Sequence, residues 1–227
     1  MIADPHAVAT RWQAPRLRAL AAIARAVTEA PWALTAADRA VAGAAGLDDD
    51  ALLHAIALAA YFGHLNRIAD VTGVPLDYEV VHRPPPLEPA VPPLAVAPAV
   101  ITRAPAIDVA RRPATALALD AWRAELFERD TPVLPAARRA WLADHVARWL
   151  GAPGPAPTDP PDDVAADELA LARTITLAPW RADDAALAPL RARGRDDRAL
   201  FDLVAVVSTA TVLARIDVAL RALAAAP

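Results

Sequence analysis

The chain has 227 residues, a formal net charge of −4 and a hydrophobic fraction of 56%, which is enough for one large domain or two small ones. This mild acidity offers no basic surface for nucleic acid. Cysteine is absent and all 23 basic residues are arginine, so disulfides, thiol peroxidase chemistry, thiolate metal sites and lysine Schiff bases are excluded. Ser208 is the only serine and lies in an apolar run, so a serine nucleophile is not expected.

Two helices are predicted near the N-terminus. Residues 15–30 carry apolar side chains at spacings of three and four, and Pro31 ends that helix. Thr35 is suited to cap the next helix, because Asp38 stands where a capping box places its acid. Gly46 is expected to end this second helix.

A long helix is predicted between Gly46 and Gly73. Asp48 is a suitable N-cap, and Asp49 and Asp50 place negative charge in the first turn, where the helix dipole favours it. Gly73 suits the left-handed residue that ends a helix. One face collects apolar and small residues, namely Leu52, Ile56, Ala59, Ala60 and Gly63. Such a face allows close helix packing and predicts deep burial.

The proline content divides the chain into three parts. About ten of the 23 prolines fall within residues 75–113, which excludes helix there. We therefore expect a first helical repeat at 1–75, a proline-rich extended connector at 76–113 lying over the helical body, and a second helical unit at 114–227. Partner binding through PxxP motifs is an alternative role for the connector. The helices predicted for the second unit span 114–129, 135–150, 163–177, 183–193 and 196–224.

An internal repeat relates the two units. Shifting the chain by 148 positions aligns Ala24–Trp32 with Ala172–Trp180, and about 19 of 49 positions from Ala22 to Asp70 match without a gap. The second copy lies at 163–225. Such a repeat implies two copies of a three-helix unit packed about a pseudo-twofold axis.

The repeat also separates structural residues from the others. Trp32 and Trp180 occur in both copies and are expected to be core anchors. Arg67 and Arg215 also match, and we expect them to bond carboxylates or helix ends. Three polar side chains occur in the first copy only, namely Tyr61, His64 and Asn66. These residues are freer to serve a function.

The stretch YFGHLNRIADVTGV resembles the carboxymuconolactone decarboxylase and alkylhydroperoxidase D-like superfamily. The residues that match its pattern are Phe62, Asn66, Arg67, Ala69, Asp70, Gly73 and Val74. The resemblance covers 15–75 well and 114–225 more loosely. It implies an all-α, AhpD-like helical fold and assembly into dimers, trimers or larger rings. Peroxidase members carry a Cys-x-x-Cys motif where this chain has Gly151 to Gly154, so disulfide-based peroxidase activity is chemically excluded.

Two functional hypotheses follow for the first copy. Tyr61, His64 and Arg67 stand three residues apart and are expected to form one polar ridge. In a cysteine-free decarboxylase-like or lyase-like enzyme, His64 would be the general acid or base, and Tyr61 and Arg67 would position a small carboxylate or lactone. The other hypothesis, slightly favoured by the missing motif, is a non-catalytic binding or scaffold protein. An enzyme needs a water-accessible pocket around His64, whereas a scaffold can bury this residue.

The other histidines give weaker signals. His54 precedes Tyr61 by two turns and can join the same cleft, whereas His145 lies between Trp141 and Trp149 and is expected to pack against them. The five histidines show no metal-ligand spacing, so neither a metal nor another cofactor is expected.

The predicted setting is cytoplasmic, because the N-terminus does not read as a signal peptide. The apolar stretches Ala51–Leu65 and Ala199–Ala214 are predicted to be too short to span a bilayer. The expected partners are a second copy of the chain, through the small-residue faces Ala55–Gly63 and Ala205–Thr211, and a small anionic ligand. Nucleic acid and membrane are not expected as partners.

Overall fold

The computed structural model describes residues 14–74, 113–131, 133–152 and 156–224, and every regular element in these ranges is helical. The predicted all-α class is thus confirmed. The α-helices are α2 (Pro15–Glu29), α3 (Ala36–Ala44), α4 (Asp49–Thr72), α5 (Pro113–Phe127), α6 (Ala136–Trp149), α7 (Asp163–Leu177), α8 (Asp184–Ala192) and α9 (Asp197–Ala224), with 3-10 turns η1 (Pro31–Ala33) and η2 (Pro179–Arg181). The predicted connector lies outside the described residues, except that Pro113 begins α5.

Local sequence signals set the helix ends as predicted. Thr35 and Asp38 form the capping box of α3, with Thr35 N donating to Asp38 Oδ2 over 2.8 Å. Asp48 caps α4 by accepting a 2.8 Å hydrogen bond from the Ala51 amide. Gly73 ends α4 in the left-handed conformation, with φ of 65°.

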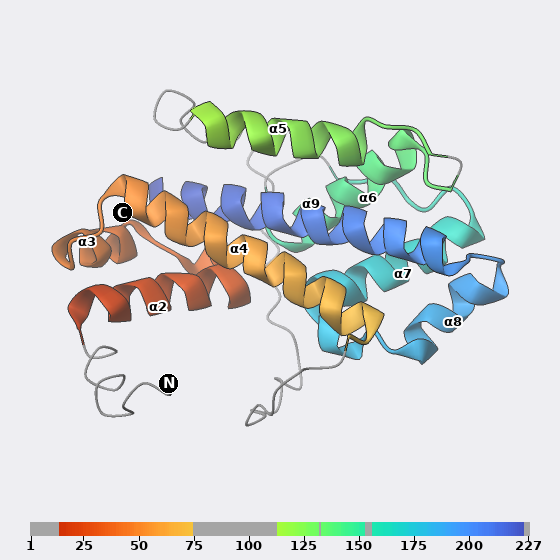
Figure 1. The fold of residues 1–227 in the computed structure, drawn as a ribbon, viewed down its shortest axis with the longest axis horizontal. Coiled ribbons are helices and arrows are strands. Elements are labelled where there is room, and N and C mark those ends of the chain that lie inside the picture. Colours follow the sequence, from red (N-terminus) through yellow and green to blue (C-terminus); the bar gives the residue numbers. More distant parts are fainter. Residues whose placement is uncertain (1–13, 75–112, 132, 153–155, 225–227) are drawn as a thin grey trace, which may run out of the picture.

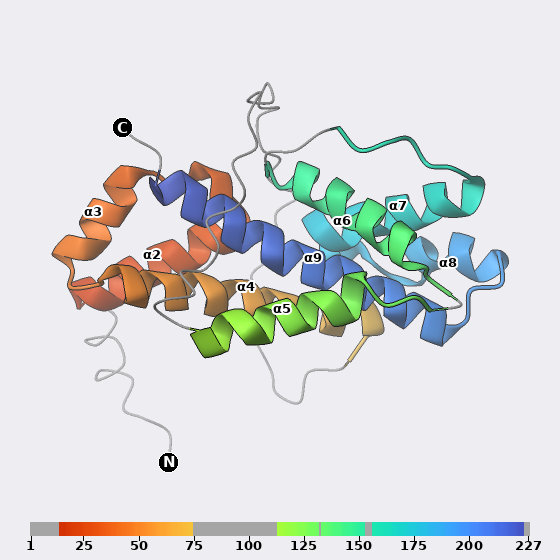
Figure 2. The same ribbon diagram turned by 90° about the horizontal axis from the view of Figure 1, so that it is seen from above.

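The two long helices, α4 and α9, lie side by side through the middle of the molecule (Figure 1) and contact each other more than any other pair does. Helices α2 and α3 lie at one end of this pair, and α6, α7 and α8 lie at the other. Seen from above, α5 runs along α4 and α9 (Figure 2). The described fold is therefore organised around one helix–helix contact.

Two apolar cores lie at the two ends of this central pair. One core combines α6, α7, α8 and the first half of α9 with Val71 from the end of α4. The other combines α2, Ala42 of α3 and the first half of α4 with the second half of α9, from Val212 to Leu223. Each long helix thus contributes to both cores, which explains why α9 is apolar on all sides.

Helix α9 is longer than the apolar stretch predicted at this place. Among the described residues, it is the one helix whose length and composition would allow it to cross a membrane. The predicted apolar stretch, Ala199–Ala214, is thus part of a longer apolar helix. In the fold, 78% of its apolar window is buried inside the helical body, as in the core helix of a globular protein.

The helices of the two halves begin at matching positions. Helix α7, turn η2, α8 and α9 each begin 148 positions after α2, η1, α3 and α4, respectively. Gly46 and Gly194, which precede the long helices, are also 148 positions apart, and both have φ of 81°.

The two tryptophans that follow α2 and α7 differ in burial, although they also stand 148 positions apart. Trp32 is partly buried and packs against the core that contains α6, whereas Trp180 is 39% exposed and is not the predicted core anchor. That core includes Leu142 and Val146 of α6 and Leu150 directly after this helix.

Candidate functional site

Tyr61, His64 and Arg67 follow one another along α4, but this series of polar residues runs from solvent into the interior. Their exposed fractions fall from 44% for Tyr61 to 9% for His64 and 5% for Arg67. Three residues advance a helix by about 300°, so each residue in the series is rotated by about 60° from the one before. Two such steps carry the series from the solvent side of α4 to its buried side.

His64 lies in the contact between α4 and α9. Its Nδ1 atom is 2.8 Å from the Ser208 hydroxyl, which also lies within hydrogen-bond distance of the His64 carbonyl, at 3.2 Å. The Trp122 ring of α5 meets the imidazole edge-on, with 5.3 Å between centroids, and the Tyr61 ring stacks beside it at 6.1 Å. His64 is thus enclosed by side chains from three helices.

This environment favours a neutral imidazole. Burial lowers the pKa of His64, and the nearby positive charge of Arg67 lowers it further, while hydrogen bonding with Ser208 opposes both effects. At neutral pH His64 is therefore uncharged and can accept the proton that the Ser208 hydroxyl donates.

The Ser208–His64 distance is one that a nucleophile and its base can have, but the surroundings do not suit catalysis. Ser208 is fully buried, so a substrate cannot approach its oxygen. Its single hydroxyl proton also has two acceptors on residue 64, the imidazole and the backbone carbonyl. The hydrogen bond between Ser208 and His64 instead joins α9 to α4.

Arg67 likewise faces the interior and not an open site. Its Nε donates to the Ile175 carbonyl at 3.2 Å, and its Nη2 to that of Thr176 at 3.4 Å. Its Nη1 donates back to the Gly63 carbonyl at 2.7 Å. The prediction that Arg67 bonds carboxylates or helix ends holds in its second form, since these partners include carbonyls at the end of α7.

Arg215 makes the corresponding bonds at the end of α2. Its Nη1 donates to the carbonyls of Val27, at 2.7 Å, and Thr28. Burial lowers the pKa of Arg67 to about 10, and burial together with the charge of Arg67 lowers the pKa of Arg215 to about 9. Both guanidinium groups remain protonated at neutral pH.

A glycine makes room for the Arg67 conformation. A Cβ atom added at Gly63 would lie 2.9 Å from Arg67 Nη1, which is too close for an ordinary contact. The residue at the corresponding place in α9 is Thr211. Arg215 has no bond to the Thr211 carbonyl among the described residues, and its Nε is buried without a partner there.

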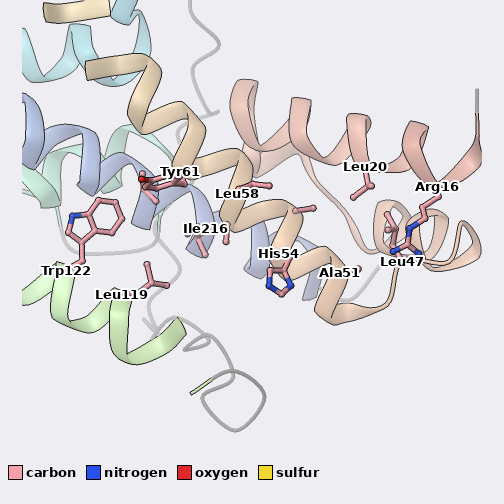
Figure 3. Close-up of a pocket in the computed structure, with 13 residues that line it drawn as sticks. Arg16, Leu20, Leu47, Ala51, His54, Leu58, Tyr61, Leu119, Trp122 and Ile216 are labelled. Carbon is pink, nitrogen blue, oxygen red and sulfur yellow. The ribbon is translucent and has the colours of Figure 1, made fainter. Parts of the chain in front are cut away.

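A groove with a volume of about 530 Å³ opens beside His64 but does not include it. Helices α2, α4, α5 and α9 line it, together with Leu47 (Figure 3). His54 and Tyr61 belong to its wall, whereas His64 and Arg67 do not. The imidazole of His54 is held by its own helix, with Nδ1 3.1 Å from the Asp50 carbonyl. The groove therefore includes His54 and Tyr61, but it does not include all three candidate catalytic residues.

The remaining histidine with a described position packs as predicted. The His145 ring lies 4.8 Å from that of Trp141 and 5.8 Å from that of Trp149. His145 and Trp141 both contact the carbonyl oxygen of Thr158, at 3.1 Å and 3.0 Å. In the part of the chain that the structure describes, no group of three His, Cys, Asp or Glu residues is placed to hold a metal ion.

Sequence reasoning missed two partners of His64, namely Trp122 and Ser208. The repeat contained a signal for the serine. Position 64 is matched by Val212, and position 208 is matched by Ala60, so both members of the polar pair depart from their counterparts. Because both polar residues replace apolar residues at positions that the repeat pairs, the sequence contained a sign that His64 and Ser208 contact each other. No comparable signal exists for Trp122, which lies outside the repeat.

Comparisons of the chain with protein-family models, with curated proteins and with solved structures found no match.

Proposed function

We propose that this chain is a non-catalytic binding or scaffold protein, a divergent and non-peroxidatic relative of the carboxymuconolactone decarboxylase and alkylhydroperoxidase D-like superfamily. The observation that carries the proposal is the enclosure of His64. This residue is 9% exposed, is hydrogen-bonded to Ser208, and does not line the groove. Ser208, the side chain that is hydrogen-bonded to it, is itself fully buried. A general acid or base needs to reach a substrate, and this one does not.

The internal repeat and the AhpD-like arrangement are part of the same proposal. Arg67 of α4 bonds the carbonyls of Ile175 and Thr176, while Arg215 of α9 bonds those of Val27 and Thr28. Each residue in the first set is 148 positions from its equivalent in the second. Helix α4 also contacts η2 while α9 contacts η1. Reciprocal contacts of this kind are what a pseudo-twofold axis between two copies produces, and they support the repeat.

The alternative is a decarboxylase-like or lyase-like enzyme that uses His64 as general acid or base with Tyr61 and Arg67. One feature favours it, because Tyr61 touches both the groove and the His64 ring. Movement of Trp122 would then have to open His64 to the groove. Arg67 is a poor substrate ligand in this scheme, since each of its three guanidinium nitrogens already donates to a backbone carbonyl.

The experiment compares the wild-type chain with His64→Val on a panel of small carboxylates and lactones. Turnover is followed by NMR, and binding by calorimetry. We expect no turnover with either protein, and equal binding to both, because His64 lies outside the groove. Conversion by the wild type that His64→Val abolishes would establish the enzyme and overturn the binding role.

We also propose that the chain forms a homodimer through α4. Four large apolar side chains on one side of this helix face solvent, at spacings of three, four and seven; they are Leu58, Tyr61, Phe62 and Leu65. The other predicted face, Ala205–Thr211, lies in the α4–α9 contact and is mostly buried within the chain, so it is unsuitable as an interface. A twofold contact centred on Phe62 and Leu65, which do not line the groove, would cover these residues on both copies.

A further inference from the structure

The groove has the size and lining of a small-molecule site. Its volume of about 530 Å³ lies within the range of about 300–1,000 Å³ that such sites occupy. The lining is almost wholly apolar, and α4 presents small side chains to it through Ala51, Ala55 and Ala57. From Ala51 to Tyr61 the helix advances about 15 Å, at about 1.5 Å per residue. The site is therefore elongated along α4.

One end of the groove carries a positive charge. Arg16 of α2 lies with Leu47 at one end, and Tyr61 and Trp122 lie at the other (Figure 3). Arg16 Nη1 donates to the Gly46 carbonyl, which holds the guanidinium in place. Within the described ranges Arg16 forms no ion pair and no other hydrogen bond, so its Nε–Nη2 edge is available to bind a carboxylate through two parallel hydrogen bonds.

We infer that the groove binds a linear amphiphile, with its anionic head group on Arg16 and its apolar chain along α4 towards Trp122. This inference rests on the proposed binding role and names the ligand class. The apolar walls would take the chain out of water, and the single cation would fix its direction.

A peptide helix fits the groove less well. A helix about 10 Å across would need roughly 1,200 Å³ over a length of about 15 Å, so most of it would lie outside the site. A flexible hydrocarbon chain has a much smaller cross-section and matches both the volume and the length.

The test is calorimetric titration of the full chain with three probes below their micelle-forming concentrations. These are decanoate, 1-decanol and decyltrimethylammonium, which share the chain and differ in head-group charge. Decanoate should bind most tightly and decyltrimethylammonium most weakly. Octanoate should bind more weakly than decanoate, by about fourfold for each methylene removed.

Arginine variants test the head-group site. Arg16→Gln should weaken decanoate binding by about tenfold, the loss expected for a charge-assisted pair at an exposed site, and should leave 1-decanol binding unchanged. Arg18→Gln is the matched control, because Arg18 is an exposed arginine of the same helix that does not line the groove. It should leave the binding of both probes unchanged.

A second pair of variants tests the chain site without disturbing the core. Leu58 and Leu65 are both exposed residues of α4, but only Leu58 lines the groove. Leu58→Asp should abolish decanoate binding by placing a carboxylate against the apolar chain, whereas Leu65→Asp should preserve it. Melting curves of both variants establish that each is folded.

The outcomes separate this inference from the binding role. Equal affinity for decanoate and 1-decanol, unaffected by Arg16→Gln, would overturn the anionic head group and leave the binding role intact. Equal losses with Arg16→Gln and Arg18→Gln would also overturn it, since the charge effect would then be nonspecific. If no probe binds, this inference fails, whereas the non-catalytic role is still decided by the comparison of the wild type with His64→Val.

Discussion

At the scale of single residues, the proposed repeat pairs His64 with Val212 and Ser208 with Ala60. His64 meets Ser208, and the corresponding residues Val212 and Ala60 both belong to one apolar core. The chain therefore contains a polar and an apolar version of the same contact. If the proposed repeat holds, we expect the fold to accept an aliphatic side chain where His64 stands.

His64→Val should change the free energy of unfolding by about 1 kcal/mol or less. The substitution removes the 2.8 Å bond to Ser208, but the hydroxyl can still donate to the carbonyl of residue 64, at 3.2 Å. No buried hydroxyl is then left unpaired, which avoids the larger penalty. Urea unfolding measures the difference. A loss above about 3 kcal/mol would show that the imidazole itself is needed for the fold.

The same residue should make stability depend on pH. Burial lowers the pKa of His64 in the folded state, so the unfolded state takes up this proton first as the pH falls. Stability is therefore present above the unfolded-state value of about 6.5 and is lost as the pH falls through it. The melting temperature of the wild type should fall more than that of His64→Val between about pH 7.5 and about pH 5.5. Parallel pH profiles would contradict the assignment.

Unlike His64, Arg67 and Arg215 should each contribute strongly to the free energy of unfolding. Truncating either residue leaves two or more helix-end carbonyls without their charged donor, and we expect losses of about 3–5 kcal/mol. Arg67→Lys should not restore the stability, because an ammonium cannot reproduce the fork of the guanidinium. Arg173→Ala, at an exposed site of α7, is the control and should change stability by less than about 0.5 kcal/mol. Chemical denaturation provides the comparison, and a stable Arg67→Ala variant would refute the structural role.

At the scale of elements, α4 differs from α9 mainly in how much of its surface the rest of the chain covers. Helix α9 runs between both cores and is buried on most sides, whereas the outer side of α4 stays open from Leu58 to Leu65. The difference arises because α9 lies among α2, α5, α6 and α7, while α4 lies at the edge of this group. A ligand or a second copy therefore has more access to α4 than to α9, although Val212 and Ile216 of α9 also line the groove.

A glycine-to-alanine pair tests the close packing inside α4. Such a change in a helix interior usually raises stability by about 1 kcal/mol. Gly43→Ala in α3 should show this gain, because a Cβ there meets nothing within 4 Å. Gly63→Ala should instead lower stability, because its Cβ would lie 2.9 Å from Arg67 Nη1 and displace the guanidinium from its bonds. Melting temperatures of the two variants decide the point, and equal gains would show that Arg67 adapts freely.

At the scale of the whole molecule, the exposed side of α4 gives the proposed dimer a specific test. Light scattering should give the mass of two chains at micromolar concentration. Phe62→Glu should give the mass of one chain, since Phe62 is 55% exposed and charge there opposes a twofold contact. Val41→Glu is the control, because Val41 is 65% exposed but lies on α3. A wild-type monomer would refute the dimer.

The sequence by itself determined the helices and their ends. Thr35, Asp48, Asp183 and Gly73 are local signals, and each acts within a few residues of its own position. The 148-residue repeat also indicated that Arg67 is structural, since Arg215 matches it. The helix ends depend on short-range hydrogen bonds and on the conformational preferences of single residues. Both can be recognised from the local sequence.

Only the tertiary structure decided what surrounds His64. Its enclosure depends on the position of Trp122 in α5 and on the residue of α9 that faces it, which is Ser208. Neither partner can be inferred from the spacing of residues within α4. The groove, too, exists only because Arg16, Leu47, Leu58 and Trp122 converge from separate elements. Helical periodicity assigns a residue to one side of its own helix, but the neighbours that cover that side are set by packing between segments far apart in the chain.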